Sequence, residues 1–151
     1  MNVESKTTGK AVIRPFETSD AEAVYGVYRS LVGEERALIE TDILCGDLGG
    51  ALDLSFVAEV DGRVEGFIIA RHTYVGEPPV ESGLLYGLGV HPVYQRQGLA
   101  SRLVTAVAEK AGSSGIRNLR VMLNERDSQI EGFFQRLNFH RAKLAVYDLE
   151  L

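Results

Sequence analysis

The amino-acid sequence predicts a single α+β domain, in which short strands and amphipathic helices follow one another along 151 residues. Apolar runs of strand length alternate with segments whose apolar residues repeat at helical spacing. An Asp-Gly pair separates two of the strand-like runs, as in a hairpin. A chain of this length normally forms one domain with its own core. Residues 1–10 lack these patterns, so we expect a flexible N-terminus before a domain of residues 11–151.

The expected elements alternate between the two types along the whole chain. In order they are a strand at 11–16, a helix begun by Thr18 or Ser19, a helix at 34–44, strands at 55–60, 63–72 and 84–90, a helix at 99–112, a strand at 117–124, a helix from Ser128, and closing strands at 139–142 and 144–151. Loops are expected at 46–53 and 74–82.

Turn and cap residues set the boundaries of the first elements. Ser19 and Glu22 have the spacing of a capping box at a helix start. Gly33 is favourable just past a helix end. The apolar stripe of this first helix consists of Val24, Val27, Tyr28 and Leu31. Asp61-Gly62 is a favoured two-residue turn, so the strands on either side of it should pair.

The later elements are bounded by similar residues. Gly76, Pro78 and Pro79 predict the loop at 74–82. Ser128 and Glu131 can form a second capping box. It opens a helix whose apolar side consists of Ile130, Phe133, Phe134 and Leu137. In the last segment, apolar side chains alternate and would share one face of a strand.

Residues 84–100 carry the most informative pattern of the chain. The apolar run ends before Pro92, which cannot continue the hydrogen bonds of a ladder. The next helix then presents the free N–H groups of its first turn, which together carry about half a positive charge. Gly98 lets a ligand approach the backbone closely, and Gln95 and Arg96 add side-chain donors. This combination predicts an anion site suited to a pyrophosphate.

This segment resembles the acetyl-CoA loop of the Gcn5-related N-acetyltransferase (GNAT) family. Gln95, Gly98 and Ala100 match the family pattern Q/R-x-x-G-x-G/A, with V-x-P upstream and an amphipathic helix downstream. The alternative is an ordinary strand–turn–helix connection whose glycine serves only the turn. Other phosphate loops fit worse, because the chain has no G-x-x-x-x-G-K-[ST]. Pro92 also stands where a dinucleotide fingerprint starting at Gly87 needs its third glycine.

The resemblance covers nearly the whole chain and implies the GNAT (acyl-CoA N-acyltransferase) fold, a central, mostly antiparallel sheet flanked by helices. In the family, pantetheine enters a gap between the strand before the turn and the strand before the last helix. The residues implied to bind acetyl-CoA are Leu88, Gly89, Val90, Gln95, Arg96, Gln97, Gly98, Leu99, Ala100, Ser101, Asn124, Asp127 and Phe134.

The resemblance also implies how the thioester is activated. The backbone N–H of Val90 or Leu88 would face the thioester oxygen, and a fixed donor at such a position is worth roughly 3–4 kcal/mol. Gly87 and Gly89 can instead serve close packing or a bulge, and a bulge would free the backbone groups that this role needs.

The group that removes the amine's proton is not identified by the resemblance. Many relatives carry an acidic residue on the strand before the turn, but residues 84–90 contain no carboxylate. Tyr86, His72 and Glu81 are the remaining candidates, with Tyr86 placed as the catalytic residue. Packing is the alternative role of the Tyr86 ring, and solvated charges are the alternative for the other two.

A second departure concerns the leaving thiolate. The family motif N-x-x-A-x-x-x-Y-x-x-x-G-F carries a tyrosine that protonates the sulfur, and Phe134 stands at that position here. Asp127 replaces the asparagine of the motif. The spacing of Phe134 predicts core packing. A thiol with a pKa of about 8.5 can leave as the anion, and water or Tyr147 could replace the missing acid.

Composition narrows the partners. The net charge of −5 and the lack of a basic run argue against nucleic acid. Cys45 is alone, which excludes an internal disulfide or a cysteine zinc site, so we expect no metal and a reducing compartment. The first residues lack the apolar stretch of a signal peptide and nothing has the pattern of a membrane span, so we expect a cytoplasmic protein.

Acidic residues gather where the family builds its acceptor site. They are Glu34, Glu35, Glu40, Asp42, Asp47 and Asp53, with Arg36 as the one basic residue among them. They favour a cationic amine, and a solvated helix face is the alternative.

The sequence therefore predicts an acetyl-CoA-dependent N-acetyltransferase that acetylates a primary amine by direct transfer, as a monomer or homodimer. Two other functions stay open, a catalytically weak acyl-CoA-binding sensor or interaction module and a nucleotide-binding domain unrelated to CoA.

Overall fold

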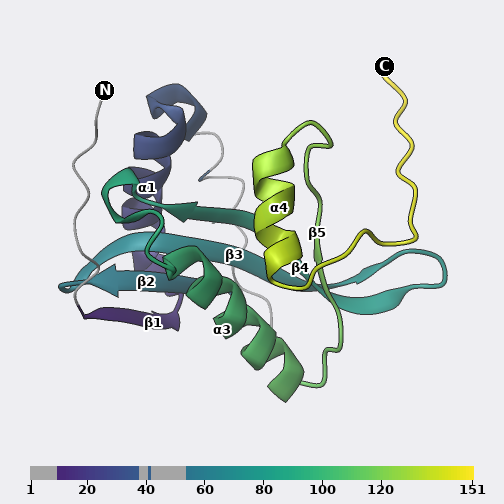
Figure 1. Cartoon of the computed structure of the whole chain (residues 1–151), viewed down its shortest axis with the longest axis horizontal. Coiled ribbons are helices and arrows are strands. Elements are labelled where there is room, and N and C mark those ends of the chain that lie inside the picture. Colours follow the sequence, from purple (N-terminus) through teal and green to yellow (C-terminus); the bar gives the residue numbers. More distant parts are fainter. Residues whose placement is uncertain (1–9, 38–40, 42–53) are drawn as a thin grey trace.

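The computed structural model describes residues 10–37, 41 and 54–151 (Figure 1). In chain order its elements are β1 (Ala11–Pro15), the 3-10 helix η1 (Thr18–Asp20), α1 (Ala21–Val32), β2 (Phe56–Val60), β3 (Arg63–Val75), β4 (Val80–Val90), the 3-10 helix η2 (Pro92–Tyr94), α3 (Leu99–Ser113), β5 (Leu119–Val121) and α4 (Ser128–Arg136). Residues 34–37 and 41 are also helical. The rest of the helix predicted at 34–44, the loop predicted at 46–53 and residues 1–9 lie outside the described residues.

The strands form one mixed sheet in the order β1-β2-β3-β4-β5. The three pairs formed by β1 to β4 are antiparallel, whereas β5 runs parallel to β4. The predicted hairpin turn is confirmed, since Asp61 and Gly62 have φ values of 51° and 78° between β2 and β3. The α+β class predicted from the sequence is therefore confirmed.

Helices cover both faces of this sheet (Figure 1). Side chains alternate along β3, so Phe67 and Ile69 pack with α1 while Ile68 and Ala70 pack with α3 and α4. The face toward α3 also holds buried Leu103 and Val107, which have the predicted helical spacing. The two cores fix β4 between two layers, and β4 is the strand that leads to the predicted anion site.

Helix starts differ by a residue or two from the predicted capping boxes. Ser19 lies inside η1, and the residue before α1 is Asp20. The Asp20 carboxylate accepts a hydrogen bond from the Glu17 backbone N–H at 2.8 Å and is paired with Arg14 at 2.8 Å. At α4 the cap is Asp127, not Ser128, because its carboxylate accepts from the Ile130 N–H at 3.1 Å. At α4 an aspartate therefore forms the bond that was predicted for a serine. At the first helix the Asp20 carboxylate instead completes the capping box of η1, and it forms no side-chain cap of α1.

The loop predicted at 74–82 is instead a long hairpin between β3 and β4. Thr73 pairs with Ser82, Tyr74 with Glu81 and Val75 with Val80, which leaves residues 76–79 for the turn. The prediction was wrong because the glycine and prolines mark only the turn itself, while the residues on either side can extend the ladder.

The closing strands predicted at 139–142 and 144–151 do not form, and these residues have no helix or strand. The strand predicted at 117–124 is also shorter, from Leu119 to Val121. Phe139 packs against Phe134, and Arg141 is paired with Glu131 at 3.0 Å, so this segment is held along α4 and not along the sheet. No helix among the described residues is long and apolar enough to cross a bilayer.

Candidate functional site

β4 and β5 stay together over only three residue pairs. Residues 83–85 of β4 pair with residues 119–121 of β5, and the Gly83 N–H donates to the Asn118 carbonyl oxygen at 2.8 Å. β4 continues to Val90, whereas β5 ends at Val121. Beyond this pairing, no strand of the described chain lies on that side of β4. Among the described residues, this side of β4 therefore has no neighbouring strand beyond Leu85.

A β-bulge marks the point where the two strands separate. On β3 the successive residues Ile69 and Ala70 pair with Gly87 and Leu85, so Tyr86 is the extra residue. A bulge turns backbone groups away from the regular ladder and re-aims side chains. The bulge foreseen as one role for the β4 glycines is thus adjacent to Gly87.

The bulge exposes Tyr86 on the α1 side of the sheet. Its side chain is 46% exposed, and Cζ of Arg71 lies 5.4 Å from the centroid of its ring. Arg71 pairs with Leu84 in the register of the sheet, immediately before the bulge. The Tyr86 ring thus lies on the Arg71 guanidinium and is also open to solvent. Packing alone does not require this exposure, which would let the phenol contact a bound acceptor.

Gly89 lies further along β4, next to the buried core. A Cβ at this position would meet Cε1 of Phe67 at 2.7 Å and Cδ1 of Leu31 at 2.9 Å. Any side chain at position 89 would therefore displace core atoms. Close packing, the alternative foreseen from the sequence, accounts for this glycine.

The predicted anion site is a tight turn between η2 and α3. Arg96 and Gly98 both have left-handed backbone conformations, with φ values of 62° and 84°. Gly98 is the N-cap residue of α3, and a Cβ built on it meets nothing within 4 Å. Its carbonyl oxygen accepts the first bond of α3, from the Arg102 N–H at 3.0 Å. The N–H groups of the residues before Arg102 have no acceptor within the helix, as at any helix start.

The charge around this turn suits an anion. The first turn of α3 contains no acidic residue, and the partial positive charge of a helix N-terminus attracts anions. The open space at Gly98 would let phosphate oxygens approach the backbone N–H groups directly. Among the residues the structure describes, no three His, Cys, Asp or Glu side chains gather as a metal site would require.

Gln95 has a role that the sequence did not indicate. Its side-chain Nε2 donates to the Val90 carbonyl oxygen at 3.0 Å. One of the two amide hydrogens therefore joins the turn to the end of β4, and is not a free donor for a ligand. A glutamine five residues after a strand end gives no local signal for such a bond.

Phe134 lies in the hydrophobic core, as its spacing predicts. It is 4% exposed, and its ring centroid lies 5.0 Å from that of Phe133 and 5.1 Å from that of Phe139. Asn124 and Asp127 are used locally, since their side-chain oxygens accept from the N–H groups of Arg126 and Ile130. Their contacts with a co-substrate stay predictions.

The other candidates for proton transfer lie away from the bulge. His72 Nε2 and Glu81 Oε1 are 2.7 Å apart near the tip of the β3–β4 hairpin. Glu81 precedes Tyr86 by five residues, about 16 Å along a strand. Tyr147 is 92% exposed on a segment that leads away from α4 (Figure 1). The proposed replacement of the missing acid by Tyr147 therefore does not fit a single copy of the chain.

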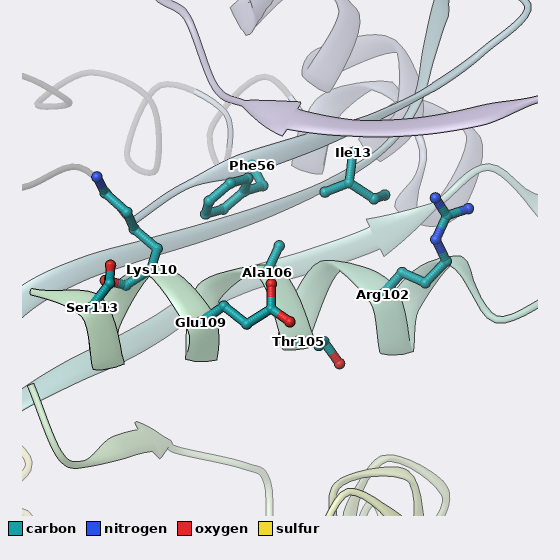
Figure 2. Close-up of a pocket in the computed structure, with 8 residues that line it drawn as sticks. All are labelled: Ile13, Phe56, Arg102, Thr105, Ala106, Glu109, Lys110 and Ser113. Carbon is teal, nitrogen blue, oxygen red and sulfur yellow. The ribbon is translucent and has the colours of Figure 1, made fainter.

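The acidic region expected at the acceptor side falls mainly outside the description. Glu34 and Glu35 are exposed, whereas Glu40, Asp42, Asp47 and Asp53 lie outside the described residues. A groove of about 620 Å³ lies away from this region, between α3 and the strands β1 and β2 (Figure 2). Ile13 and Phe56 face Arg102, Ala106 and Lys110 across it. None of the predicted site residues lines this groove.

Comparison with known proteins places this geometry in a family. The acetyltransferase (GNAT) domain family matches residues 52–141. An acetyltransferase of Yersinia pestis is 31% identical over 87 residues, and one of Pectobacterium atrosepticum is 30% identical over the same length. Each match covers 58% of this chain and 57% of the relative, so the chain matches little more than half the length of these relatives.

Solved structures agree with the fold over nearly the whole chain. An aminoglycoside N-acetyltransferase, AAC(6')-Iy, in complex with a CoA-containing bisubstrate analogue has a TM-score of 0.73 at 22% identity, covering 95% of this chain and 99% of that one. A ribosomal-protein-alanine N-acetyltransferase of Brucella melitensis has a TM-score of 0.72 at 17% identity, covering 93% and 99%. At these identities the likeness shows a shared fold.

Proposed function

The chain belongs to the GNAT acetyltransferase family, and on that basis we propose that it transfers an acetyl group from acetyl-CoA directly to a primary amine. The observation that carries the proposal is the continuous path from the Gly98 turn, along the unpaired part of β4, to the bulge at Tyr86. The path offers backbone donors at each end and an exposed side chain where the reaction would take place. The cytoplasmic location expected from the sequence is part of the same proposal.

The turn would hold the pyrophosphate of acetyl-CoA. Gly98 leaves the space open, and the first N–H groups of α3, at Leu99, Ala100 and Ser101, supply donors and partial positive charge. The backbone N–H groups of Arg96 and Gln97 lie in the same turn, and the left-handed conformation of Arg96 helps to shape a concave set of N–H groups. The Gln95–Val90 bond fixes this set relative to β4.

The unpaired stretch of β4 would hold the pantetheine arm and activate the thioester. Its amide groups can form strand-like hydrogen bonds with β4 from residue 86 to Val90. The N–H of Leu88 or Val90 would donate to the thioester oxygen. As the amine nitrogen attacks the carbonyl carbon, this oxygen becomes an oxyanion, which a fixed donor stabilises.

Tyr86 would take part in the transfer of the amine's proton. The attacking amine must be neutral, so its ammonium form first loses a proton, here through the phenol oxygen of Tyr86 and water. Tyr86 is exposed at the bulge, and residues 84–90 contain no carboxylate that could do this instead. The proton passes to solvent, and no covalent bond to the protein forms.

The C–S bond breaks when the tetrahedral intermediate collapses to the amide. The CoA sulfur leaves as a thiolate, because the buried ring of Phe134 carries no proton to donate. The attached nitrogen loses its second proton as the amide forms, and this proton reaches the thiolate through water, so the products are the amide and the free thiol of CoA. A thiol is acidic enough to leave in this way, which an alcohol is not.

The acceptor is proposed only as a class. One structural relative acts on aminoglycosides and another on an alanine of a ribosomal protein, so this fold serves several different amines. A cationic amine remains the expectation from the acidic residues between 34 and 53.

Release of free thiol from acetyl-CoA tests the function. The purified chain is incubated with acetyl-CoA and a panel of aminoglycosides, polyamines, amino acids and peptides with free N-termini, and thiol is measured with a chromogenic reagent. We expect thiol release that depends on the amine, with an acetylated product detected by mass spectrometry.

Binding of acetyl-CoA without turnover of any amine would favour the sensor function, which the absence of an acid at Phe134 also suits. Equal competition by ATP would favour a nucleotide-binding domain.

A further inference from the structure

One face of the sheet carries two arginines where β3, β4 and β5 lie side by side (Figure 1). Arg71 of β3 pairs with Leu84 of β4, and Leu84 pairs with Arg120 of β5. Residues that are paired in this way point to the same face of a sheet. Neighbouring strands are about 4.8 Å apart, so the two arginines lie in one row across the sheet with a single apolar residue between them.

This row lies on the same face as α1. On the opposite face, a Cβ at Gly83 would meet Cδ2 of Leu119 at 2.7 Å and Cδ1 of Leu54 at 3.0 Å, and both leucines pack in the core toward α3. Side chains alternate along a strand, so the residues that follow Gly83 and Leu119 point the other way. Tyr86 shares their face, because Cζ of Arg71 lies 5.4 Å from the centroid of its ring.

A buried serine orients the Arg120 side chain on this face. Arg120 Nε donates to Ser82 Oγ at 3.4 Å, and the Ser82 hydroxyl donates in turn to the Val80 carbonyl oxygen at 3.2 Å. Ser82 is fully buried, whereas Arg120 is half-buried. Within the described part of the chain, the two terminal nitrogens of Arg120 form no hydrogen bond or ion pair. The guanidinium is therefore oriented through Nε, and its outer edge can bind a ligand.

Carboxylates are scarce on this part of the sheet. In β4, β5 and residues 67–75 of β3, the one carboxylate is that of Glu81. Its Oε1 lies 2.7 Å from Nε2 of His72, and His72 pairs with Gly83 on the opposite face. An anion on the α1 face therefore meets two arginines and no carboxylate of these strand segments.

The arginine row lies where an acceptor would approach. The Gly98 turn begins α3, which packs on the opposite face of the sheet. Acetyl-CoA held at that turn would bring its thioester to β4 from the α3 side, which leaves the α1 side, with the exposed Tyr86, to the acceptor. Leu84, at the centre of the row, precedes Tyr86 by two residues, a span of no more than about 7 Å. An acid group bound at the row and an amine at Tyr86 can therefore belong to one small molecule.

We propose that Arg120, together with Arg71, binds an oxyanion of the acceptor, so that the acceptor is a small primary amine that also carries a carboxylate or phosphate group. A guanidinium binds either group through two parallel hydrogen bonds. The ammonium end of such an acceptor is still a cation, in keeping with the acidic residues between 34 and 53. This inference rests on the proposed function, because it names the substrate class of that reaction.

Acceptors that differ only in the acid group test the inference. Amino acids are compared with their carboxamides, and phosphoethanolamine with ethanolamine, by thiol release from acetyl-CoA. We expect a higher kcat/KM for the acid-bearing member, and the pair that responds distinguishes a carboxylate from a phosphate. Arg120→Gln should raise KM for that acceptor roughly 10- to 100-fold and keep kcat within a few-fold. It should leave KM for the neutral member nearly unchanged, which a merely structural role of Arg120 would not do.

Two further variants control for charge and folding. Arg117→Gln removes an exposed arginine just before β5 and should leave KM unchanged for both members of each pair. Arg120→Lys keeps the positive charge but loses the two-pronged geometry, so its KM for the acid-bearing acceptor should lie between those of the native chain and Arg120→Gln. Thermal unfolding and the acetyl-CoA Kd establish that the compared variants fold and bind the donor.

Calorimetry without turnover separates this inference from the proposed function. The same acceptors are titrated into protein saturated with CoA, which cannot react. Acid-selective binding that Arg120→Gln abolishes, with no thiol release from any amine, would contradict the proposed function and still support the anion subsite. Thiol release that is equally fast with the neutral members, or that Arg120→Gln does not change, would overturn the inference and leave the function intact. The absence of acid selectivity in both binding and turnover would also overturn it.

Discussion

The side-chain amide of Gln95 donates to the carbonyl oxygen of Val90 at 3.0 Å, which joins the proposed pyrophosphate turn to the end of β4. The turn and the strand would hold two different parts of acetyl-CoA, so their relative position decides whether both can bind at once. One hydrogen bond between side chain and backbone therefore links the two halves of the proposed site.

Gln95→Ala should weaken acetyl-CoA binding without unfolding the domain. A hydrogen bond of this kind contributes about 0.5–1.5 kcal/mol, so we expect an increase in Kd of roughly 2- to 10-fold. Isothermal titration calorimetry measures the effect. Gln135→Ala, on the exposed side of α4, is the control and should bind normally. An unchanged Kd for Gln95→Ala would mean that the turn holds its position without this bond.

Gly98→Glu should abolish the stabilisation of the protein by acetyl-CoA, because the new side chain fills the open turn and repels phosphate. Saturation at about 100 times Kd adds ~2.7 kcal/mol to the folded state, which corresponds to roughly 5–10 °C in Tm for a domain of this size. Differential scanning fluorimetry with millimolar acetyl-CoA measures the shift.

Gly115 provides a matched control for this substitution. It follows the other end of α3, has the same φ of 84°, and likewise has nothing within 4 Å of an added Cβ. Gly115→Glu therefore introduces the same strain and charge, but should keep the full acetyl-CoA shift. Loss of the shift in both variants would point to a general effect of strain and contradict the assigned site.

Tyr86→Phe should lower kcat and alter its pH dependence, because it removes the phenol oxygen proposed to relay the amine's proton. Loss of a general acid–base group typically costs roughly 10²–10⁴ in rate, and water can recover part of this. The acetyl-CoA Kd should stay the same, since the backbone of β4 is unchanged. Turnover within a few-fold of the native value across the pH range would assign Tyr86 to packing against the acceptor.

The sequence predicts the parts of this site that depend on local patterns. The end of β4 before Pro92, the start of α3 after Gly98 and the buried stripe containing Phe134 all follow from residues close together in the chain. The bulge at Tyr86 and the His72–Glu81 pair depend on the register between β3 and β4. That register is set by packing on both faces of the sheet, which no short stretch of sequence reveals.

The closing strands show a different limit of prediction. The alternation at Tyr147, Leu149 and Leu151 indicates a strand with one apolar face, but a strand also needs a neighbour for its backbone groups. Whether residues 139–144 follow the sheet or α4 depends on distant contacts such as the packing of Phe139 against Phe134. The strand propensity of this segment therefore predicts that it can form a strand. It does not predict which neighbouring strand would pair with it.

Asp20→Asn should destabilise the fold near neutral pH. The Arg14 guanidinium, which bonds both carboxylate oxygens at 2.8 Å, lowers the pKa of Asp20 below its ordinary value, and the Glu17 N–H adds to this effect. Because the folded pKa is depressed, the stabilisation is present above the unfolded pKa. It is lost as the pH falls below about 4 and passes through the folded pKa.

Urea unfolding at pH 7 and at pH 3 measures this contribution. We expect Asp20→Asn to cost about 1.5–3 kcal/mol at pH 7, the range for hydrogen bonds to charged groups, and less at pH 3. Glu131→Gln breaks the more exposed pair with Arg141 and should have little effect at either pH. An equal cost for Asp20→Asn at both pH values would show that ionisation of Asp20 contributes nothing.

Phe134 distinguishes packing from chemistry at the position where relatives carry a proton donor. Its ring lies between Phe133 and Phe139 in the core, so Phe134→Ala should cost about 3–5 kcal/mol of stability. Phe134→Leu should cost less, and should leave turnover per folded molecule within a few-fold because the ring takes no part in proton transfer. Phe134→Tyr should fold and keep or raise turnover, because the resemblance to the family places this position beside the departing sulfur, where a hydroxyl within about 3 Å would donate a proton. Thermal unfolding and thiol release are measured on the same samples.

A large fall in turnover for Phe134→Leu at nearly native stability would show that the ring positions the thioester. If Phe134→Tyr folds and binds acetyl-CoA but loses turnover, the leaving thiolate is handled by a different arrangement.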